Sequence, residues 1–262
     1  MVDFEIKDCY KFDDLLRIME ILRAPDGCMW DREQDHHSIR RNFIEETYEV
    51  CEAIDDEDTE HMKEELGDVL LQVVFHTQME KEKGTFDIDD VADGICKKLV
   101  FRHPHVFGTV DARDSGQALN TWDAQKREEK GQRTAADTLD SVARSLPALM
   151  RAEKIQDKAR KAGFDWAEMG PALDKAEEEL GELRQAVEQG ANVEEELGDL
   201  LFAAVKVGRF AGLDSEQALH GTCEKFIRRF RRVEELAGGR SLDSLGLHRL
   251  EELWQQAKQD EA

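Results

Sequence analysis

The chain has few of the residues that interrupt helices and none of the patterns that build strands. Among its 262 residues are only four prolines and two tyrosines, and no alternating β-branched run reaches strand length. Leu, Ala, Glu, Lys and Arg, which favour helix over sheet, are abundant. Hydrophobic residues make up 40% of the sequence, enough for a packed core. We therefore predict an all-α fold.

Positive charge is also scarce. The chain has 36 Lys and Arg residues against 59 Asp and Glu residues, a formal net charge of −23. A general nucleic-acid binder needs the opposite balance, because contacts to phosphates supply most of its non-specific affinity. The composition argues against DNA, RNA or an anionic membrane as the main partner. It does not exclude a small anion held through a metal.

Disulfides, zinc sites and membrane spans also lack support. The five cysteines are scattered and form no C-x-x-C pair, so reduced thiols are expected. No basic segment followed by an apolar one marks a signal peptide at the start of the chain. No apolar run approaches the ~20 residues that a membrane-spanning helix needs. We expect a cytoplasmic protein without a membrane partner.

One unit of sequence occurs twice. MKEELGDVLL at 62–71 and VEEELGDLLF at 193–202 each follow an E-E-x-x-E motif. Downstream, Lys followed four residues later by Arg, and then Trp followed four residues later by Lys, recur in the same order. From Glu46 to Trp122 is 76 residues, and from Glu179 to Trp254 is 75. This repetition predicts two tandem helical-bundle domains, 1–130 and 131–262.

Periodicity and turn residues predict five helices in each half. Those of the first half span 13–24, 38–55, 59–82, 88–101 and 116–129. Those of the second half span 141–161, 172–189, 193–211, 215–236 and 248–259. The boundary should lie in the polar stretch 127–138, which lacks a strong apolar period.

Helical spacing places pairs of acids from the repeated motifs on common helix faces. Two such helices, packed antiparallel through a short connection, would bring four carboxylates together in each half. The four are Glu46, Glu49, Glu65 and Asp68 in the first half, and Glu179, Glu182, Glu196 and Asp199 in the second. A solvated face explains most other acids, but the second helix of each pair is apolar nearly all round, which predicts burial.

A cluster of buried carboxylates needs a counter-ion. Two carboxylates ~4 Å apart repel by roughly 4 kcal/mol at an effective dielectric constant near 20. A divalent cation relieves this repulsion, and oxygen ligands without His or Cys favour Mg²⁺, with Mn²⁺ as a possible substitute. Gly67 and Gly198 lie between the acids, at a cost of ~1 kcal/mol each relative to Ala. They indicate either close helix packing or room for a ligand.

Basic and aromatic residues that recur in both halves suit a nucleotide. Arg and Lys bind phosphates, and Trp can stack on a base, although solvated surface and core packing are their commoner fates. Lys175 precedes Glu179 by one helical turn and could reach the same pocket, whereas Asn42 replaces it in the first half. The other candidates are Lys225, Arg229 and Trp254 in the second half, and Lys98, Arg102 and Trp122 in the first.

Other motifs are weaker. His103 and His105 could bind a metal, but the second half has no counterpart and loop packing explains them. The chain has no P-loop motif and no credible Ser–His–Asp or Cys–His arrangement. A di-iron carboxylate bundle would require paired E-x-x-H motifs, and the one present, Glu33 to His36, is not repeated. A non-catalytic scaffold or nucleotide sensor stays a second alternative.

E-E-x-x-E followed by E-x-x-D on the next helix resembles the signature of the all-α nucleoside triphosphate pyrophosphohydrolases of the MazG type. The resemblance covers nearly the whole chain and includes GCMWDREQ, RHPHVFG, SLPALMRAEKIQDKA, GFDW and EKFIRRFR. Two positions depart from the pattern. Met29 stands where proline is expected, and Phe101 stands where the second half has Arg228, so the first half offers one cation fewer.

The resemblance implies Mg²⁺-dependent hydrolysis of a nucleoside triphosphate to its monophosphate and pyrophosphate, in a homodimer, as housecleaning of the nucleotide pool. In our hypothesis the four acids of a half hold Mg²⁺, and Glu178 or Glu195 positions or deprotonates the attacking water. Lys175, Lys225 and Arg229 would contact phosphates, and Trp254 would line the base pocket. We favour the second half because Lys175 and Arg228 add cations there.

Overall fold

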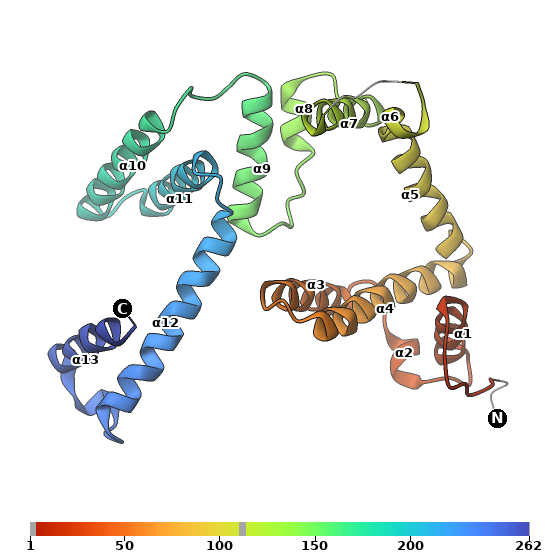
Figure 1. Cartoon of the computed structure of the whole chain (residues 1–262), viewed down its shortest axis with the longest axis horizontal. Coiled ribbons are helices and arrows are strands. Elements are labelled where there is room, and N and C mark those ends of the chain that lie inside the picture. The colour runs from red at the N-terminus through yellow and green to blue at the C-terminus, as the bar shows by residue number, and fades with distance from the viewer. Residues whose placement is uncertain (1–3, 110–113, 262) are drawn as a thin grey trace. The chain divides into compact units, whose positions relative to one another are not determined.

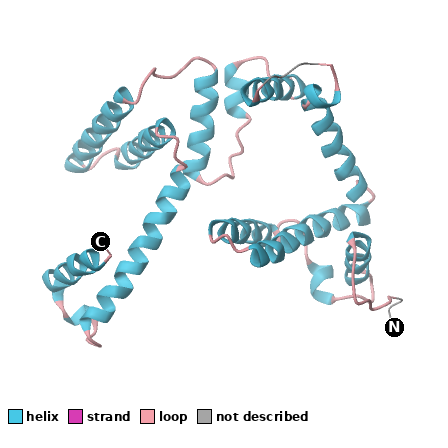
Figure 2. Cartoon of the chain, viewed as in Figure 1, coloured by secondary structure: helices cyan, strands magenta, loops and turns pink. Residues whose placement is uncertain are grey.

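The computed structural model describes residues 4–109 and 114–261 of the chain. Every regular element in these ranges is a helix, with no strand among them (Figure 2). The all-α prediction is therefore confirmed. None of the described helices combines the length and the hydrophobicity needed to cross a membrane.

Contacts within the chain define two compact units, Met1–Lys126 and Arg127–Ala262. The division predicted from the sequence, between residues 130 and 131, falls just inside the second unit. Each unit contains one copy of the repeated acidic motifs, and we describe each unit by itself.

The first unit is built around a long helix, α4 (Thr59–Lys83), which packs antiparallel to α3 (Arg40–Asp55) (Figure 1). The connection is short: Glu57 adopts a left-handed conformation, and Asp58 caps α4 by accepting hydrogen bonds from two backbone N–H groups. The remaining helices are α1 (Phe12–Arg23), α2 (Met29–Glu33), α5 (Ile88–Arg102), α6 (Pro104–Phe107) and α7 (Ser115–Glu129).

The core of this unit lies at the carboxyl-terminal part of α4, where α1 packs against it. Met19 of α1 is 1% exposed and contacts Val74, Phe75 and Met79 of α4. The helix ends at Gly84, which adopts the left-handed conformation that terminates helices readily. The core therefore anchors the far end of α4 and leaves the acid-bearing turns near its start outside the densest packing.

The second unit repeats the hairpin with α10 (Gly170–Gln189) and α11 (Val193–Phe210). Gly190 and Asn192 both adopt left-handed conformations, so the chain reverses within three residues. The other helices are α8 (Ala135–Asp140), α9 (Ala148–Lys161), α12 (Ser215–Ala237), the 3-10 helix η1 (Leu242–Ser244) and α13 (Gly246–Asp260).

Two hydrogen bonds connect α9 to α11 and α12 in this unit. The buried Gln156 of α9 donates a 2.8 Å hydrogen bond to the Phe202 carbonyl of α11. Glu216, in the first turn of α12, accepts a 3.3 Å hydrogen bond from the backbone N–H of Met150 at the start of α9. A separate core of Val233, Ala237, Leu253 and Ala257 joins α12 to α13.

The ten helices predicted from the sequence are all present. The sixth of them, predicted at 141–161, starts later than expected, because it corresponds to α9, which begins at Ala148, directly after Pro147. Proline disfavours helical geometry in the residue before it, which explains the delayed start. The short elements α2, α6, α8 and η1 were not predicted, since so few residues carry no readable period.

The prediction that the second helix of each hairpin is buried holds for the later turns of α4, where Val74, Phe75 and Met79 are buried, but is wrong for the acid-bearing turns of α4 and for much of α11. Leu66 and Leu70 of α4 are 50% and 39% exposed, and Leu197 and Leu201 of α11 are 46% and 47% exposed. A hairpin of two helices covers only one face of each member, and the other helices of each unit do not reach these leucines. Both acid-bearing hairpins therefore present a bare apolar stripe.

A network of side-chain hydrogen bonds joins α4 to the loop before α3. The Glu80 carboxylate accepts hydrogen bonds from Lys83 Nζ at 2.6 Å, Thr85 Oγ1 at 2.5 Å and His36 Nε2 at 2.6 Å. The other ring nitrogen of His36 lies 2.7 Å from Nδ1 of His76. The three donors lower the pKa of Glu80 to about 2.

Glu80 should make the stability of the first unit sensitive to acid. Because its pKa is lower in the folded than in the unfolded chain, its contribution is complete above about pH 4.5 and is lost as the pH falls towards 2. We expect Glu80→Gln to lower the thermal unfolding temperature at pH 7 and to have little effect near pH 2, as measured by circular dichroism. Glu60→Gln removes an exposed charge paired with Lys63 and serves as the control. An equal and pH-independent loss in both variants would contradict this role of Glu80.

Candidate active sites

In the first half, α3 and α4 bring three carboxylates together. Glu46, Glu49 and Glu65 each place one oxygen within 4.8 Å of the others. Glu65 is the most buried, at 8% exposed, and its Oε1 lies 3.2 Å from Nε2 of His61 one turn earlier. Its Oε2 is buried without a hydrogen-bond partner.

Repulsion between the carboxylates of this cluster contributes to their raised pKa values. Burial raises the pKa of Glu46 above its ordinary value, and the charges of Asp68, Glu49 and Glu65 raise it further. Burial likewise raises the pKa of Glu65, with contributions from Glu49 and Asp68. Asp68 therefore lies close enough to act electrostatically on both residues. All four predicted acids of this half contribute to the same electrostatic repulsion.

In the second half, α10 and α11 form the corresponding cluster. Glu179, Glu196 and Asp199 place oxygens within 4.8 Å of one another. Glu179 is 6% exposed, and its Oε2 is buried without a partner. The close carboxylate of Glu179, burial and the charge of Glu196 raise the pKa of Glu182, while the charge of Lys175 opposes this rise. The four predicted acids of this half are thus brought together as well.

These residues fit a hard divalent cation. Each cluster contains a buried carboxylate oxygen with no donor, and a buried unpaired acceptor is costly. The donor set is made of carboxylate oxygens, the ligands that Mg²⁺ and Mn²⁺ prefer. A metal held in each hairpin would satisfy the free oxygen and offset the repulsion between the acids.

The glycines between the acids face open space. A Cβ atom built on Gly67 or on Gly198 would meet nothing within 4 Å among the described atoms. Of the two explanations for these glycines, close packing against another described helix of the same unit is therefore excluded. Room for a ligand or for a second chain agrees with the structure.

The basic and aromatic candidates of the second half fall into two groups. Lys175 lies in the cluster, with its Nζ 2.7 Å from Glu179 Oε1 and 2.9 Å from Glu178 Oε1. Arg229, by contrast, pairs with Glu261 at 2.6 Å, and Trp254 packs against Phe226 with ring centroids 4.9 Å apart. The exposed Lys225 lies on α12 and the exposed Glu195 on α11. Among the described residues, the structure shows no hydrogen bond or ion pair from Lys225, Arg229 or Trp254 to the four acids of the cluster.

The equivalent aromatic residue of the first half is already in contact with cations. The Arg102 guanidinium lies 5.1 Å from the Trp122 ring centroid, and Lys126 Nζ lies 4.5 Å from it. Lys98 is half-buried on α5. Both tryptophans therefore have partners at their rings, cations at Trp122 and Phe226 at Trp254.

Sequence reasoning missed His61. Its signal was present, because a residue four positions before Glu65 on one helix shares a face with it. Asn192 stands at the corresponding position of the second half.

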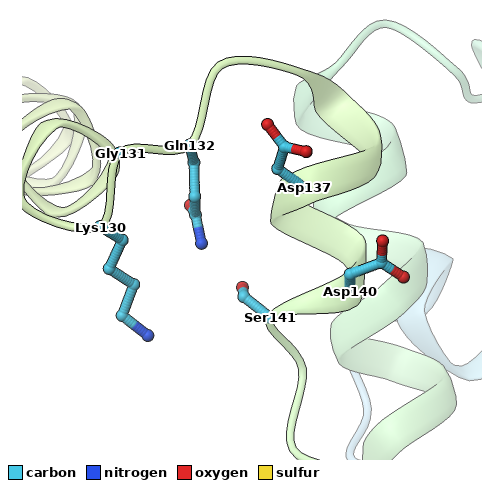
Figure 3. A pocket seen from close by; sticks show the side chains of 6 residues that line it. All are labelled: Lys130, Gly131, Gln132, Asp137, Asp140 and Ser141. Atoms are coloured by element: carbon cyan, nitrogen blue, oxygen red, sulfur yellow. The ribbon is translucent and has the colours of Figure 1, made fainter.

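A pocket of the second unit is lined by none of the residues of the acidic clusters. It is an open hollow of about 590 Å³ at the start of the second unit (Figure 3). Its lining consists of Lys130, Gly131, Gln132, Asp137, Asp140 and Ser141. None of these residues belongs to the acid-bearing helices, so we do not assign the active site to this pocket.

Two helix hairpins that each gather carboxylates around an unpaired buried oxygen define an all-α protein with two clusters that fit a hard divalent cation. The family model of the MazG nucleotide pyrophosphohydrolase domain matches residues 34–107 and 172–233, which contain both hairpins. The chain therefore belongs to the MazG nucleotide pyrophosphohydrolase family.

Relatives match over nearly the whole chain. A nucleoside triphosphate pyrophosphohydrolase of Escherichia coli (strain K12) is 48% identical over 258 residues, which is 96% of this chain and 98% of that protein. The nucleoside triphosphate pyrophosphohydrolase/pyrophosphatase MazG of Thermotoga maritima is 45% identical over 94% of this chain and 95% of its own length. The uncharacterized protein YabN of Bacillus subtilis is 45% identical over 96% of this chain and 52% of its own length.

Removing one acid should relieve the repulsion in the metal-free protein. The pKa of Glu46 is raised in the fold, so its charged form destabilises the protein above that pKa, and the penalty disappears as the pH falls. We expect Glu46→Gln to raise the unfolding temperature in EDTA at pH 8 and to have no effect near pH 4. Added Mg²⁺ should stabilise the unmodified protein more than the variant. Glu45→Gln, an exposed neighbour paired with Arg41, is the control, and equal behaviour of the two variants would exclude repulsion at Glu46.

Proposed function

We propose that the second half hydrolyses nucleoside triphosphates to the monophosphate and pyrophosphate with Mg²⁺. The observation that carries this proposal is the buried Glu179, whose Oε2 has no partner while Glu196 and Asp199 place oxygens beside it. Family membership and the names of the relatives agree with this chemistry.

The chain supplies the metal ligands and the groups around them. Glu179, Glu182, Glu196 and Asp199 would hold Mg²⁺, which, when bound, neutralises triphosphate charge and lowers the pKa of water. Glu178 or Glu195 would orient the attacking water and accept its proton. The water oxygen forms a bond to the α-phosphorus, the bond from that phosphorus to the bridging oxygen breaks, and pyrophosphate leaves.

Cations of the chain would stabilise the charge that develops on the phosphates. Lys175 is already in place, 2.7 Å from Glu179. For Lys225 and Arg229 a role in phosphate binding stays a prediction, as does base stacking for Trp254, because Arg229 pairs with Glu261, Trp254 packs against the core between α12 and α13, and Lys225 is exposed on α12. Lys175 favours the second half over the first.

The choice of half can be tested with one matched pair of variants. We expect Glu196→Gln to lower kcat/KM for pyrophosphate release by more than about 100-fold, because it removes a direct metal ligand. Glu65→Gln, the equivalent change in the first half, should leave the rate within about threefold, a change that corresponds to less than 1 kcal/mol. Loss of turnover only in Glu65→Gln would reverse the assignment. Nucleotide binding without pyrophosphate release by the unmodified protein would instead favour a sensor.

We further propose that the protein is a homodimer in which a second copy covers the bare apolar stripes. Leu180 of α10 and Leu197 and Leu201 of α11 are 46–48% exposed, and Leu66 and Leu70 of the first hairpin are 50% and 39% exposed. Contiguous exposed apolar side chains are typical of association surfaces. The five free cysteines agree with a cytoplasmic location, and hydrolysis of triphosphates there would suit housecleaning of the nucleotide pool.

Charges placed in the stripe should break the dimer. We expect the double variant Leu197→Glu/Leu201→Glu to elute and scatter light as a monomer, because a buried unpaired carboxylate opposes association. Leu247→Glu, on α13 and 73% exposed, is the control and should keep the mass of the unmodified protein. An unchanged mass in the double variant would locate the interface elsewhere.

A further inference from the structure

Each half has a basic residue one turn before its most buried glutamate, but on different helices. In the first half His61 contacts Glu65, both on α4, at 3.2 Å. In the second half Lys175 contacts Glu179, both on α10, at 2.7 Å. The two clusters are therefore not equivalent, although their acidic motifs are the same.

The lysine of the second half is a strong counter-ion. Its ammonium group bridges Glu178 and Glu179, at 2.9 Å and 2.7 Å, and hydrogen bonds to both raise its pKa. It therefore stays charged at any working pH. It occupies Oε1 of Glu179, which leaves only Oε2 of that carboxylate free, and it repels any cation that approaches.

The first half has no fixed cation at the matching place. Asn42 stands one turn before Glu46, where it carries no charge. In the first cluster the basic residue is His61, which contacts Glu65, and an imidazole is also an ordinary metal ligand. A divalent ion can therefore enter the first cluster without displacing an ammonium group.

We propose that Lys175 is a positioning residue that couples metal entry in the second half to nucleotide binding, whereas the first half binds a divalent ion by itself. Lys175 is 37% exposed and has a flexible four-carbon stem, so it can turn from Glu179 towards a triphosphate. The triphosphate supplies the ammonium with a new anionic partner and leaves both oxygens of Glu179 to the metal. This inference rests on the proposed function of the second half.

The test counts Mn²⁺ bound to the full-length protein by equilibrium dialysis, with and without an α,β-methylene nucleoside triphosphate, which is not cleaved between the α- and β-phosphates. Without nucleotide, the unmodified protein should bind Mn²⁺ in the first half only. With the nucleotide, it should bind Mn²⁺ in the second half as well. In Glu65→Gln, binding without nucleotide should disappear. In Glu65→Gln/Lys175→Met it should return, with an affinity for the second half at least about tenfold above that of Glu65→Gln.

Lys161→Met is the matched control, because Lys161 pairs with Asp157 one turn away on α9, outside the acidic helices. It should leave Mn²⁺ binding unchanged. Lys175→Met should also lower the unfolding temperature of the metal-free protein, since it leaves the buried Glu179 without its counter-ion, and Mn²⁺ should restore it. Lys175→Gln, which keeps a hydrogen-bond donor, replaces Lys175→Met if that variant does not fold.

The outcomes separate the two proposals. Equal loading of both halves without nucleotide in the unmodified protein, or unchanged affinity in the Lys175 variants, would overturn the coupling and leave the proposed function intact. Absence of Mn²⁺ from the second half even with nucleotide, in every variant, would overturn the proposed function and the coupling together.

Discussion

The repulsion between carboxylates held at the same place on two antiparallel helices governs the rest of this structure. The hairpins keep these carboxylates close together, because their turns span only a few residues and set the register between the two helices. Asp58 caps α4 in the first hairpin, and Gly190 and Asn192 take left-handed conformations in the second. Once the register is fixed, the acids have no way to separate. Their environment must therefore supply positive charge or protons.

The two halves meet that requirement differently. In the first, the pKa values of Glu46 and Glu65 rise, so the cluster approaches neutrality by holding protons more tightly. In the second, the pKa of Glu182 also rises, and the ammonium group of Lys175 in addition neutralises part of the charge directly. In the coupling that we propose, this lysine makes the second cluster less open to a free cation, and one duplicated motif would support two sites with different binding properties.

Sequence predicted the parts of this arrangement that depend on local geometry. Glu46 and Glu49, three residues apart, must share a helix face, and a short connection must bring that face towards Glu65 on the next helix. The positions of Arg229 and Trp254 could not be predicted in this way. They depend on how α12 packs against α13, where Arg229 pairs with Glu261, and such contacts leave no period in the sequence. The burial of α11 was overestimated for a similar reason, because an apolar surface does not reveal whether its own chain or another one covers it.

That last point links the apolar stripes to the chemistry. Leu197 and Leu201 flank Asp199 on α11, and Gly198 between them opens onto empty space. A second chain that covers these leucines would also border the acidic cluster, and the missing side chain at Gly198 leaves room there for a substrate. A cluster at the rim of an association surface would be enclosed and partly dried only in the assembled protein, where electrostatic interactions are stronger than in water. Association and catalysis would then depend on the same face of the hairpin, which accounts for glycine, leucine and paired acids occurring together in both copies of the motif.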